Sequence, residues 1–236
     1  MVVSPPTESL RRRRAPRGSG DLLRDEILDA ATELLLDTGH AKAVSIRSVA
    51  ESVGVTPPSI YLHFRDKDAL LDAVCARYFE KLDEEMQRVS AVQSSTVEVL
   101  RAQGLAYVRF ATENPELYRI ATMGEWRSGS NVDSALASSA FEHMCATVGV
   151  LMDEGVFPRG DAAAVALELW SAAHGAASLL IAKPHLPFGD AEAFTDRVLH
   201  AVFLGHLVAG LVEVDATPDQ VVEQLTALKS SVRGSS

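Results

Sequence analysis

Donor side chains that suit the binding of phosphates gather in the segment 45–67, whose sequence is SIRSVAESVGVTPPSIYLHFRDK. Tyr61 carries a hydroxyl, His63 an imidazole and Lys67 an ammonium group. These groups donate hydrogen bonds to anionic oxygens. Lys67 also stands at the expected start of a helix, where free N–H groups and the helix dipole favour an anion. The pattern therefore indicates contact with a phosphate backbone.

A helix-turn-helix is the element that would position these donors. Ser45 is a good N-cap for a short helix with an apolar stripe, and Gly54 supplies the turn. Thr56 is expected to cap the next helix, with Pro57 at its first position, where a missing N–H costs nothing. Such a helix presents its N-terminal residues to base edges in the major groove. Small or polar side chains suit that position, and they stand here at Thr56, Pro57, Pro58 and Ser59.

The distribution of charge is compatible with this interpretation, although the whole chain has a net charge of −10. Residues 1–70 hold 10 basic and 10 acidic side chains, so residues 71–236 carry the entire net charge. Before Asp21, five arginines face Glu8 as the only acidic residue. Attraction to phosphates depends on the local surface rather than on the total. An acidic second part would repel DNA and favour one docking orientation.

The periodicity predicts an all-α protein. From Asp21 onward every periodic segment has helical spacing, and none alternates like a strand. We expect a disordered basic arm over 1–20, the helix-turn-helix domain over 21–67, and a ligand-binding and dimerisation helical bundle over 68–230. The seam should lie within the long fourth helix. The expected helices cover about 21–38, 45–53, the segment after Thr56, 66–89, 96–112, 114–118, the segment from Phe141 to Gly155, 161–183, 190–214 and the segment after Thr217.

The first part of the chain resembles the tetracycline-repressor (TetR) family of bacterial regulators over roughly residues 22–75. The residues that carry the resemblance are the block Ile27–Leu35, then Ile46, Val49, Ala50, Gly54-Val55, Ile60–Phe64, Lys67 and Leu70-Leu71. The all-helical remainder is similar to the family's variable ligand-binding and dimerisation domain. Trp170, His174 and Gly175 are similar to a subgroup with a Trp-His-Gly signature. The resemblance implies a dimeric, ligand-responsive regulator, foremost a repressor, that binds a palindromic operator.

The resemblance also implies roles for single residues. Arg47 would contact a base or a nearby phosphate. Thr56, Pro57 and Pro58 would face the bases, and the residues that would hold phosphates are Ser59, Tyr61, His63 and Lys67. Pro57 and Pro58 offer no side-chain hydrogen bond to a base, so Arg47 is left as the residue best suited to read base edges. The expected DNA-binding set is Ser45, Arg47, Thr56, Pro57, Pro58, Ser59, Tyr61, His63 and Lys67.

Each of these assignments has a simpler alternative. Tyr61 could pack against the first helix, His63 could be a surface histidine, and Lys67 could be a solvated charge at a helix start. The arginine run could contact phosphates or the minor groove, or it could be an inert tail.

Aromatic residues and methionines concentrate in the second part of the chain and are candidates for an effector pocket. The alternative is that they form an ordinary core, because such residues at helical spacing usually do. A mostly apolar cavity with a few polar groups is the usual form of a ligand site. The expected lining is Phe79, Met86, Tyr107, Phe110, Tyr118, Met123, Trp126, Met144, Trp170 and His174.

Small residues on the segments 161–183 and 190–214 predict a homodimer interface, since they let helices approach closely across a two-fold axis. The alternative is close packing inside one subunit. The small residues are Ala172, Ala173, Gly175, Ala176 and Ala177 on the first segment and Ala201, Gly205, Ala209 and Gly210 on the second.

Two other classes of protein remain to be weighed against a ligand-responsive regulator. An enzyme is disfavoured because no common nucleotide-binding, nucleophile-elbow or metalloprotease motif is found, so we expect no catalytic residue, cofactor or metal. A constitutive architectural DNA-binding protein without a pocket is the second alternative. No uncharged stretch suits a membrane span, and the two cysteines fit a reducing compartment, which predicts a cytoplasmic protein.

Overall fold

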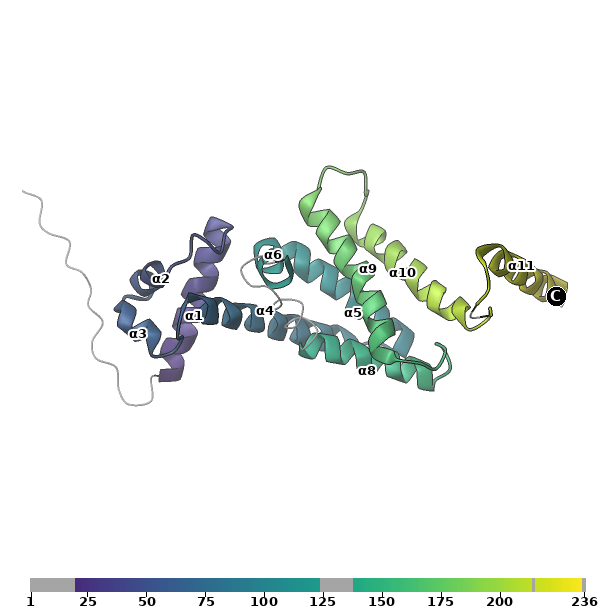
Figure 1. Ribbon diagram of the computed structural model, residues 1–236, viewed down its shortest axis with the longest axis horizontal. Coiled ribbons are helices and arrows are strands. Elements are labelled where there is room, and N and C mark those ends of the chain that lie inside the picture. Colours follow the sequence, from purple (N-terminus) through teal and green to yellow (C-terminus); the bar gives the residue numbers. More distant parts are fainter. Residues whose placement is uncertain (1–19, 124–137, 214, 235–236) are drawn as a thin grey trace, which may run out of the picture. The chain divides into compact units, whose positions relative to one another are not determined.

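The structure is a computed structural model that describes residues 20–123, 138–213 and 215–234. All regular elements in these ranges are α-helices, which confirms the expected fold class (Figure 1). The described residues form two compact units: an N-terminal unit of residues 20–79 and 114–123, and a C-terminal unit of residues 80–113, 138–213 and 215–234. The division between the two units falls within helix α4, between Phe79 and Glu80.

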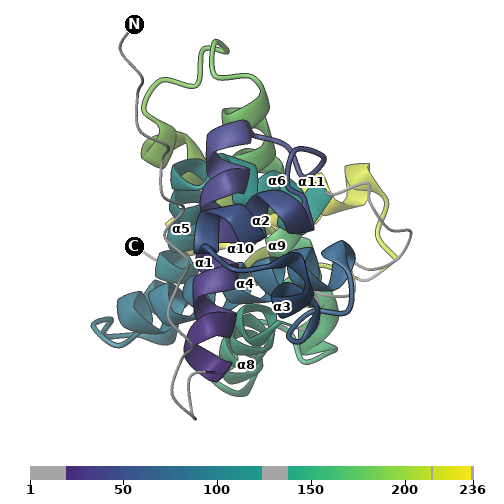
Figure 2. The same cartoon turned by 90° about the vertical axis from the view of Figure 1, so that its left-hand side faces the viewer.

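The N-terminal unit contains a helix-turn-helix. Its helices are α1 (Gly20–Thr38), α2 (Ile46–Val53), α3 (Pro57–Tyr61), the first part of α4 (Lys67–Ser90) and α6 (Pro115–Met123). Helix α2 packs against α1 and α3, and Figure 2 views these three helices from their own side. Their shared core is apolar and fully buried, with Ile27, Leu35, Val49, Ile60 and Leu70.

Capping interactions fix where the helices of this unit begin. The Ser45 hydroxyl accepts the Ser48 N–H at 3.0 Å, and the Ser48 hydroxyl accepts the Ser45 N–H at 2.9 Å. Asp66 accepts the Ala69 N–H at 2.7 Å at the start of α4. The cap at Ser45 was expected from the sequence. Thr56 stands at the N-cap of α3, but its side chain caps no backbone N–H and lies 3.1 Å from the Ser59 hydroxyl instead.

Gly54 makes the turn between α2 and α3. Its φ of 74° is a left-handed conformation that glycine adopts without strain. Its N–H bonds to the Glu51 carbonyl at 3.2 Å, and the Val55 N–H bonds to the Ala50 carbonyl at 2.9 Å. The last carbonyls of α2 are thereby satisfied, and the chain reverses directly into α3.

The C-terminal unit is a helical bundle. It contains the second part of α4, α5 (Thr96–Glu113), α8 (Ser139–Asp153), α9 (Ala162–Ala182), α10 (Ala191–Ala209) and α11 (Pro218–Gly234). Helices α5, α8 and α9 pack against one another, and α10 packs against both α5 and α9 (Figure 1). Their contact surfaces form a mainly apolar core between α5, α8 and α9.

Helices α5 and α10 approach closely at one glycine. A Cβ atom added to Gly104 would lie 2.7 Å from the Cδ1 atom of Leu199, closer than a real Cβ can approach. Leu199 is buried on α10. The absence of a side chain at position 104 therefore leaves room for the Leu199 side chain against α5.

Two helix ends differ from the expected ones. Helix α6 continues past Tyr118 to Met123. Helix α10 ends at Ala209 instead of near Val214. Gly210 caps this end, and its N–H donates to the Val208 carbonyl. A Cβ at position 210 would lie 3.0 Å from Pro158, so this end is also a close contact. Residues 1–19 of the expected arm lie outside the described residues, and Gly20 begins α1.

Candidate nucleic-acid interface and effector site

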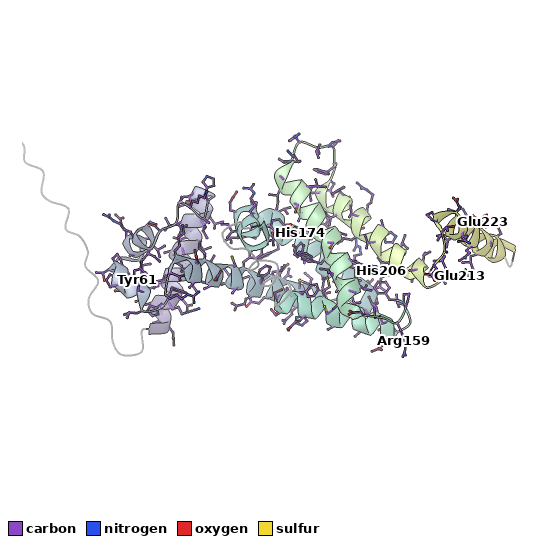
Figure 3. All side chains as sticks on the ribbon, viewed as in Figure 1. Tyr61, Arg159, His174, His206, Glu213 and Glu223 are labelled. Carbon is purple, nitrogen blue, oxygen red and sulfur yellow. The ribbon has the colours of Figure 1, made fainter. Side chains whose placement is uncertain are left out.

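The start of α3 forms an exposed surface. Thr56, Pro57 and Pro58 are exposed, while Ile60 is fully buried and holds the helix on the core. Tyr61 is 54% exposed at the end of α3, and Figure 3 labels its side chain. The alternative that Tyr61 packs away against α1 is therefore not supported. Its hydroxyl remains accessible to a phosphate.

Arg47 is exposed on the first turn of α2, as a base or phosphate contact requires. Ser45, two residues earlier, is also exposed, but its hydroxyl is engaged in the cap of α2. Ser59 and His63 are half-buried. These side chains all belong to the N-terminal unit.

Lys67 has a partner within the chain that the sequence did not reveal. Its Nζ atom donates to the Ala41 carbonyl at 2.6 Å, in the loop between α1 and α2. An ammonium group has three N–H donors, so this bond leaves others for a phosphate. The contact fixes the side chain near the start of α4 and links this helix to the loop.

Two further contacts hold the helices of the N-terminal unit together. The Arg24 guanidinium lies 5.3 Å from the centre of the Phe64 ring, and Arg77 on α4 pairs with Asp29 on α1 at 2.6 Å. Both partners of each contact are visible in the sequence, but their distance along the chain gives no sign of the pairing.

The candidate effector residues divide between the two units. Phe79 and Tyr118 are buried in the N-terminal unit. Met86, Tyr107 and Met144 are buried in the C-terminal unit, where Phe110, Trp170 and His174 are half-buried. Trp126 and the side chain of Met123 lie outside what the structure describes.

Tyr107, His174 and Trp170 are brought together between α5 and α9, and Figure 3 labels His174. The Tyr107 hydroxyl lies 3.3 Å from His174 Nδ1, and the His174 and Trp170 rings stack with centroids 4.8 Å apart. Burial lowers the pKa of His174 from its ordinary value of 6.5, because desolvation disfavours the charged form. The imidazole is therefore neutral at pH 7 and offers one donor and one acceptor.

Gln103 is a buried polar residue that the sequence interpretation missed. It lies on α5 one turn before Tyr107 and is 3% exposed. Its Nε2 atom donates to the Thr147 hydroxyl at 3.0 Å and to the Ser90 hydroxyl at 3.2 Å. A glutamine on an apolar helix face was the signal that could have revealed it.

Asp83 and His143 form a second polar contact in the C-terminal unit. Asp83, on the second part of α4, is buried and lies 2.7 Å from His143 Nδ1 on α8. Gln87 donates to its other oxygen at 3.0 Å. Both carboxylate oxygens are therefore occupied within the chain.

Phe110 lines a groove whose other residues are mostly charged. This groove of about 520 Å³ runs between α4 and α5. Its charged residues are partly paired, with Arg88 on Glu85 at 2.6 Å and Arg109 on Glu192 at 3.3 Å. The full lining is Lys81, Glu84, Glu85, Arg88, Ala106, Arg109, Phe110 and Glu113. Phe110 is thus beside charges rather than within an apolar lining.

The small residues of α9 face two ways. Ala173, Ala176 and Ala177 are buried inside the chain, which confirms the intrasubunit alternative for these three. Ala172 and Gly175 are half-buried, and Ala201, Gly205, Ala209 and Gly210 on or next to α10 are exposed. Large apolar side chains stand exposed on the same two helices: Leu167, Leu179, Leu204 and Leu207.

Helix α9 is also long and apolar enough to cross a membrane by length and composition alone. Only 28% of its most apolar window is buried within the chain. Helix α9 thus packs against α5, α8 and α10 on one side and leaves part of its apolar surface open.

Both parts of the chain match models of known protein families. A family model described as "Bacterial regulatory proteins, tetR family" matches residues 27–74, and one described as "Tetracyclin repressor-like, C-terminal domain" matches residues 100–202. Together the two matches span more than half of the chain. The chain belongs to the TetR family of regulators, with an N-terminal helix-turn-helix domain and a helical C-terminal domain.

Individual relatives match only part of the chain, at low sequence identity. The chain is 28% identical to the nucleoid occlusion factor SlmA of Sodalis glossinidius over 42% of this chain and 50% of that protein. It is 30% identical to the transcriptional activator FasR of Mycolicibacterium smegmatis over 46% and 49%. The chain therefore matches about half the length of these relatives. The fold is similar to that of FadR from Bacillus subtilis, solved in complex with stearoyl-CoA, with a TM-score of 0.65, 16% identity and coverage of 77% and 98%.

Proposed function

We propose that this protein is a ligand-responsive transcriptional regulator that acts in the cytoplasm, binds a palindromic operator as a homodimer and represses until a small, largely apolar effector releases it. The observation that carries the proposal is the exposed start of α3, with the exposed Tyr61 at the end of the same helix and Lys67 at the start of α4 in the same unit. A DNA backbone would meet Tyr61, His63 and Lys67, while Arg47 and Thr56 would reach base edges.

The effector would bind in the C-terminal unit, where the neutral His174 and the Tyr107 hydroxyl supply polar groups beside the Trp170 ring. The complex of FadR from Bacillus subtilis with stearoyl-CoA is a precedent for this fold. Release would follow from geometry, because the two helix-turn-helix domains of a dimer must enter major grooves about 34 Å apart. A small change in the spacing of these domains would therefore remove much of the affinity for the operator.

The dimer would form through the exposed faces of α9 and α10. Their leucines and exposed small residues form an apolar surface of the kind that two-fold interfaces bury. Leu204→Glu should shift the protein to monomer and weaken operator binding at least tenfold, since a buried charge opposes association. Val92→Glu, at a position 79% exposed and outside these helices, is the matched control. Sedimentation that finds dimers of both variants would contradict this interface.

The direct test of the function is selection of bound sequences from random DNA, followed by titration of the selected site with candidate effectors. We expect a palindrome whose complex dissociates with effector, without turnover of the effector. A protein that binds the site but never releases it would support the alternative of a constitutive DNA-binding protein. The direction of regulation follows from transcription measured with and without effector, and activation would contradict repression.

A further inference from the structure

Gln103 contains a hydrogen-bond acceptor that the chain leaves without a donor. Its Oε1 atom is buried, and no hydrogen-bond partner reaches it among the residues that the structure describes. Buried polar atoms are almost always paired in folded proteins, because an unpaired one has lost its water. An exception at an interior position therefore calls for a partner that enters from outside.

The surrounding network fixes the orientation of the Gln103 amide. Both of its N–H groups are directed at hydroxyls, those of Ser90 and Thr147. These hydroxyls cannot return a hydrogen to Gln103, because Ser90 donates to the Met86 carbonyl at 2.6 Å and Thr147 to the His143 carbonyl at 3.1 Å. If the Gln103 amide were flipped, its two N–H groups would lie where the oxygen now lies, without acceptors. The unpaired atom is therefore the carbonyl oxygen.

The position of Gln103 connects it to the proposed effector site. Residues four apart on a helix share a face, so Gln103 and Tyr107 follow each other along one side of α5. Tyr107 in turn reaches His174 on α9. The polar groups of this side thus form a short row, with an acceptor at one end and the hydroxyl–imidazole pair at the other.

We propose that the Gln103 carbonyl oxygen is the anchor of the effector and accepts a hydrogen bond from a neutral hydroxyl or amide N–H on a largely apolar molecule. The inference rests on the proposed function. An ionised carboxylate or phosphate has no donor to offer and would place negative charge against this oxygen. A buried ammonium group would need a carboxylate, and Asp83 is already occupied by His143 and Gln87.

A pair of probes isolates this hydrogen bond. Decanamide has two amide N–H donors, and N,N-dimethyldecanamide has none but keeps the carbonyl and the alkyl chain. We expect the full-length protein to bind decanamide about tenfold more tightly by calorimetry, as one net hydrogen bond provides. Decanoate should bind more weakly than decanamide. Equal affinity for the two amides would overturn the proposal, and this is also the result expected if a water molecule already occupies the Gln103 acceptor. Tighter binding of decanoate than of decanamide would overturn it as well.

Variants assign the preference to Gln103. Gln103→Leu, or Gln103→Met if the first does not fold, should abolish the preference and leave the affinity for the dimethyl amide unchanged. Gln93→Leu removes an amide that bonds only to the Val89 carbonyl at the end of α4, and should keep the preference. A Gln103 variant that still prefers decanamide would refute the assignment.

Failure of the proposed function gives a different result. Calorimetry needs no operator, so selective binding of decanamide without release of DNA would contradict the regulatory function and leave the anchor in place. Release of DNA by both amides equally would support the regulator and refute the anchor. Absence of binding by either amide would overturn the ligand class.

Discussion

The His174 imidazole stacks on the Trp170 indole one turn earlier on α9, with ring centroids 4.8 Å apart and an angle of 29° between the planes. The stack leaves the Nδ1 edge of the imidazole for Tyr107 at 3.3 Å. The pair is therefore oriented by contacts within the chain, while both rings remain only half-buried. An oriented and partly open pair of this kind suits recognition of a ligand.

Replacing His174 should affect the response to effector more than DNA binding. We expect His174→Ala and Trp170→Phe to keep operator affinity and to need at least tenfold more effector for release, because each loses part of the oriented pair. Fluorescence anisotropy of labelled operator measures both quantities. Tyr107→Phe, which keeps the ring and removes only the hydroxyl, tests whether orientation matters.

The opposite outcome would assign the pair to the core. In that case His174→Ala would leave the Tyr107 hydroxyl without this partner and lower the free energy of unfolding by about 1–3 kcal/mol. Normal effector release together with this loss of stability would refute the role in recognition.

The lowered pKa of His174 predicts a dependence of stability on pH. Below about pH 6.5 the unfolded imidazole takes up a proton that the folded one resists. The folded state therefore loses stability as the pH falls from 6.5 through the lowered pKa, and the effect is absent above 6.5. Urea unfolding of the parent and of His174→Gln between pH 7.5 and pH 5 (roughly the range over which a histidine titrates) measures it. Parallel curves for the two proteins would contradict the prediction, since the other histidines are common to both.

Lys67 and Tyr61 should contribute to binding of all DNA sequences about equally. Both are assigned to phosphates, which position the protein without reading bases. Lys67→Ala should reduce the slope of log K against log salt by about one unit. It should also lower stability, because the bond to the Ala41 carbonyl is lost.

Lys42→Ala is the control for Lys67. Lys42 is an exposed lysine in the neighbouring loop, and its loss removes the same charge without the Ala41 contact. A salt slope that is unchanged in Lys67→Ala, or equally reduced in Lys42→Ala, would count against a specific phosphate contact at Lys67.

Arg47→Ala should relax sequence preference instead. Arg47 is a long donor side chain on the exposed start of α2, and α3 begins with two prolines that provide no side-chain hydrogen bond. Loss of one good base contact should cost about 1–3 kcal/mol at one operator position. Selection of binding sites with parent and variant tests this expectation. Recovery of the same consensus by both would exclude Arg47 as a base reader.

The sequence predicted the helices of the N-terminal unit because these depend on local patterns. Ser45 and Gly54 act through neighbours within four residues, and their expected roles as N-cap and turn are confirmed. The end of α10 was misplaced because Gly210, not the apolar pattern up to Val214, decides it.

The interior of the C-terminal unit was predicted less well because it depends on pairs that are distant along the chain. Tyr107 and His174 stood among the candidates, but their contact joins residues 67 positions apart. Gln103 escaped notice because an amide carries no motif, and its meaning depends on the hydroxyls of Ser90 and Thr147. The orientation of α9 could not be read from its composition either, since alanines that face the core and alanines that face outward alternate along it.

The close contact at Gly104 would link ligand binding to dimerisation, if both occur as proposed. Helix α5 carries Gln103 and Tyr107, and α10, which carries part of the expected dimer surface, meets α5 at this glycine through the Leu199 side chain. A ligand that displaces α5 would then also change the free energy of association of two subunits. By thermodynamic reciprocity, association must change the affinity for the ligand by the same factor. A cell that makes more of this protein would then alter the concentration of effector to which each molecule responds.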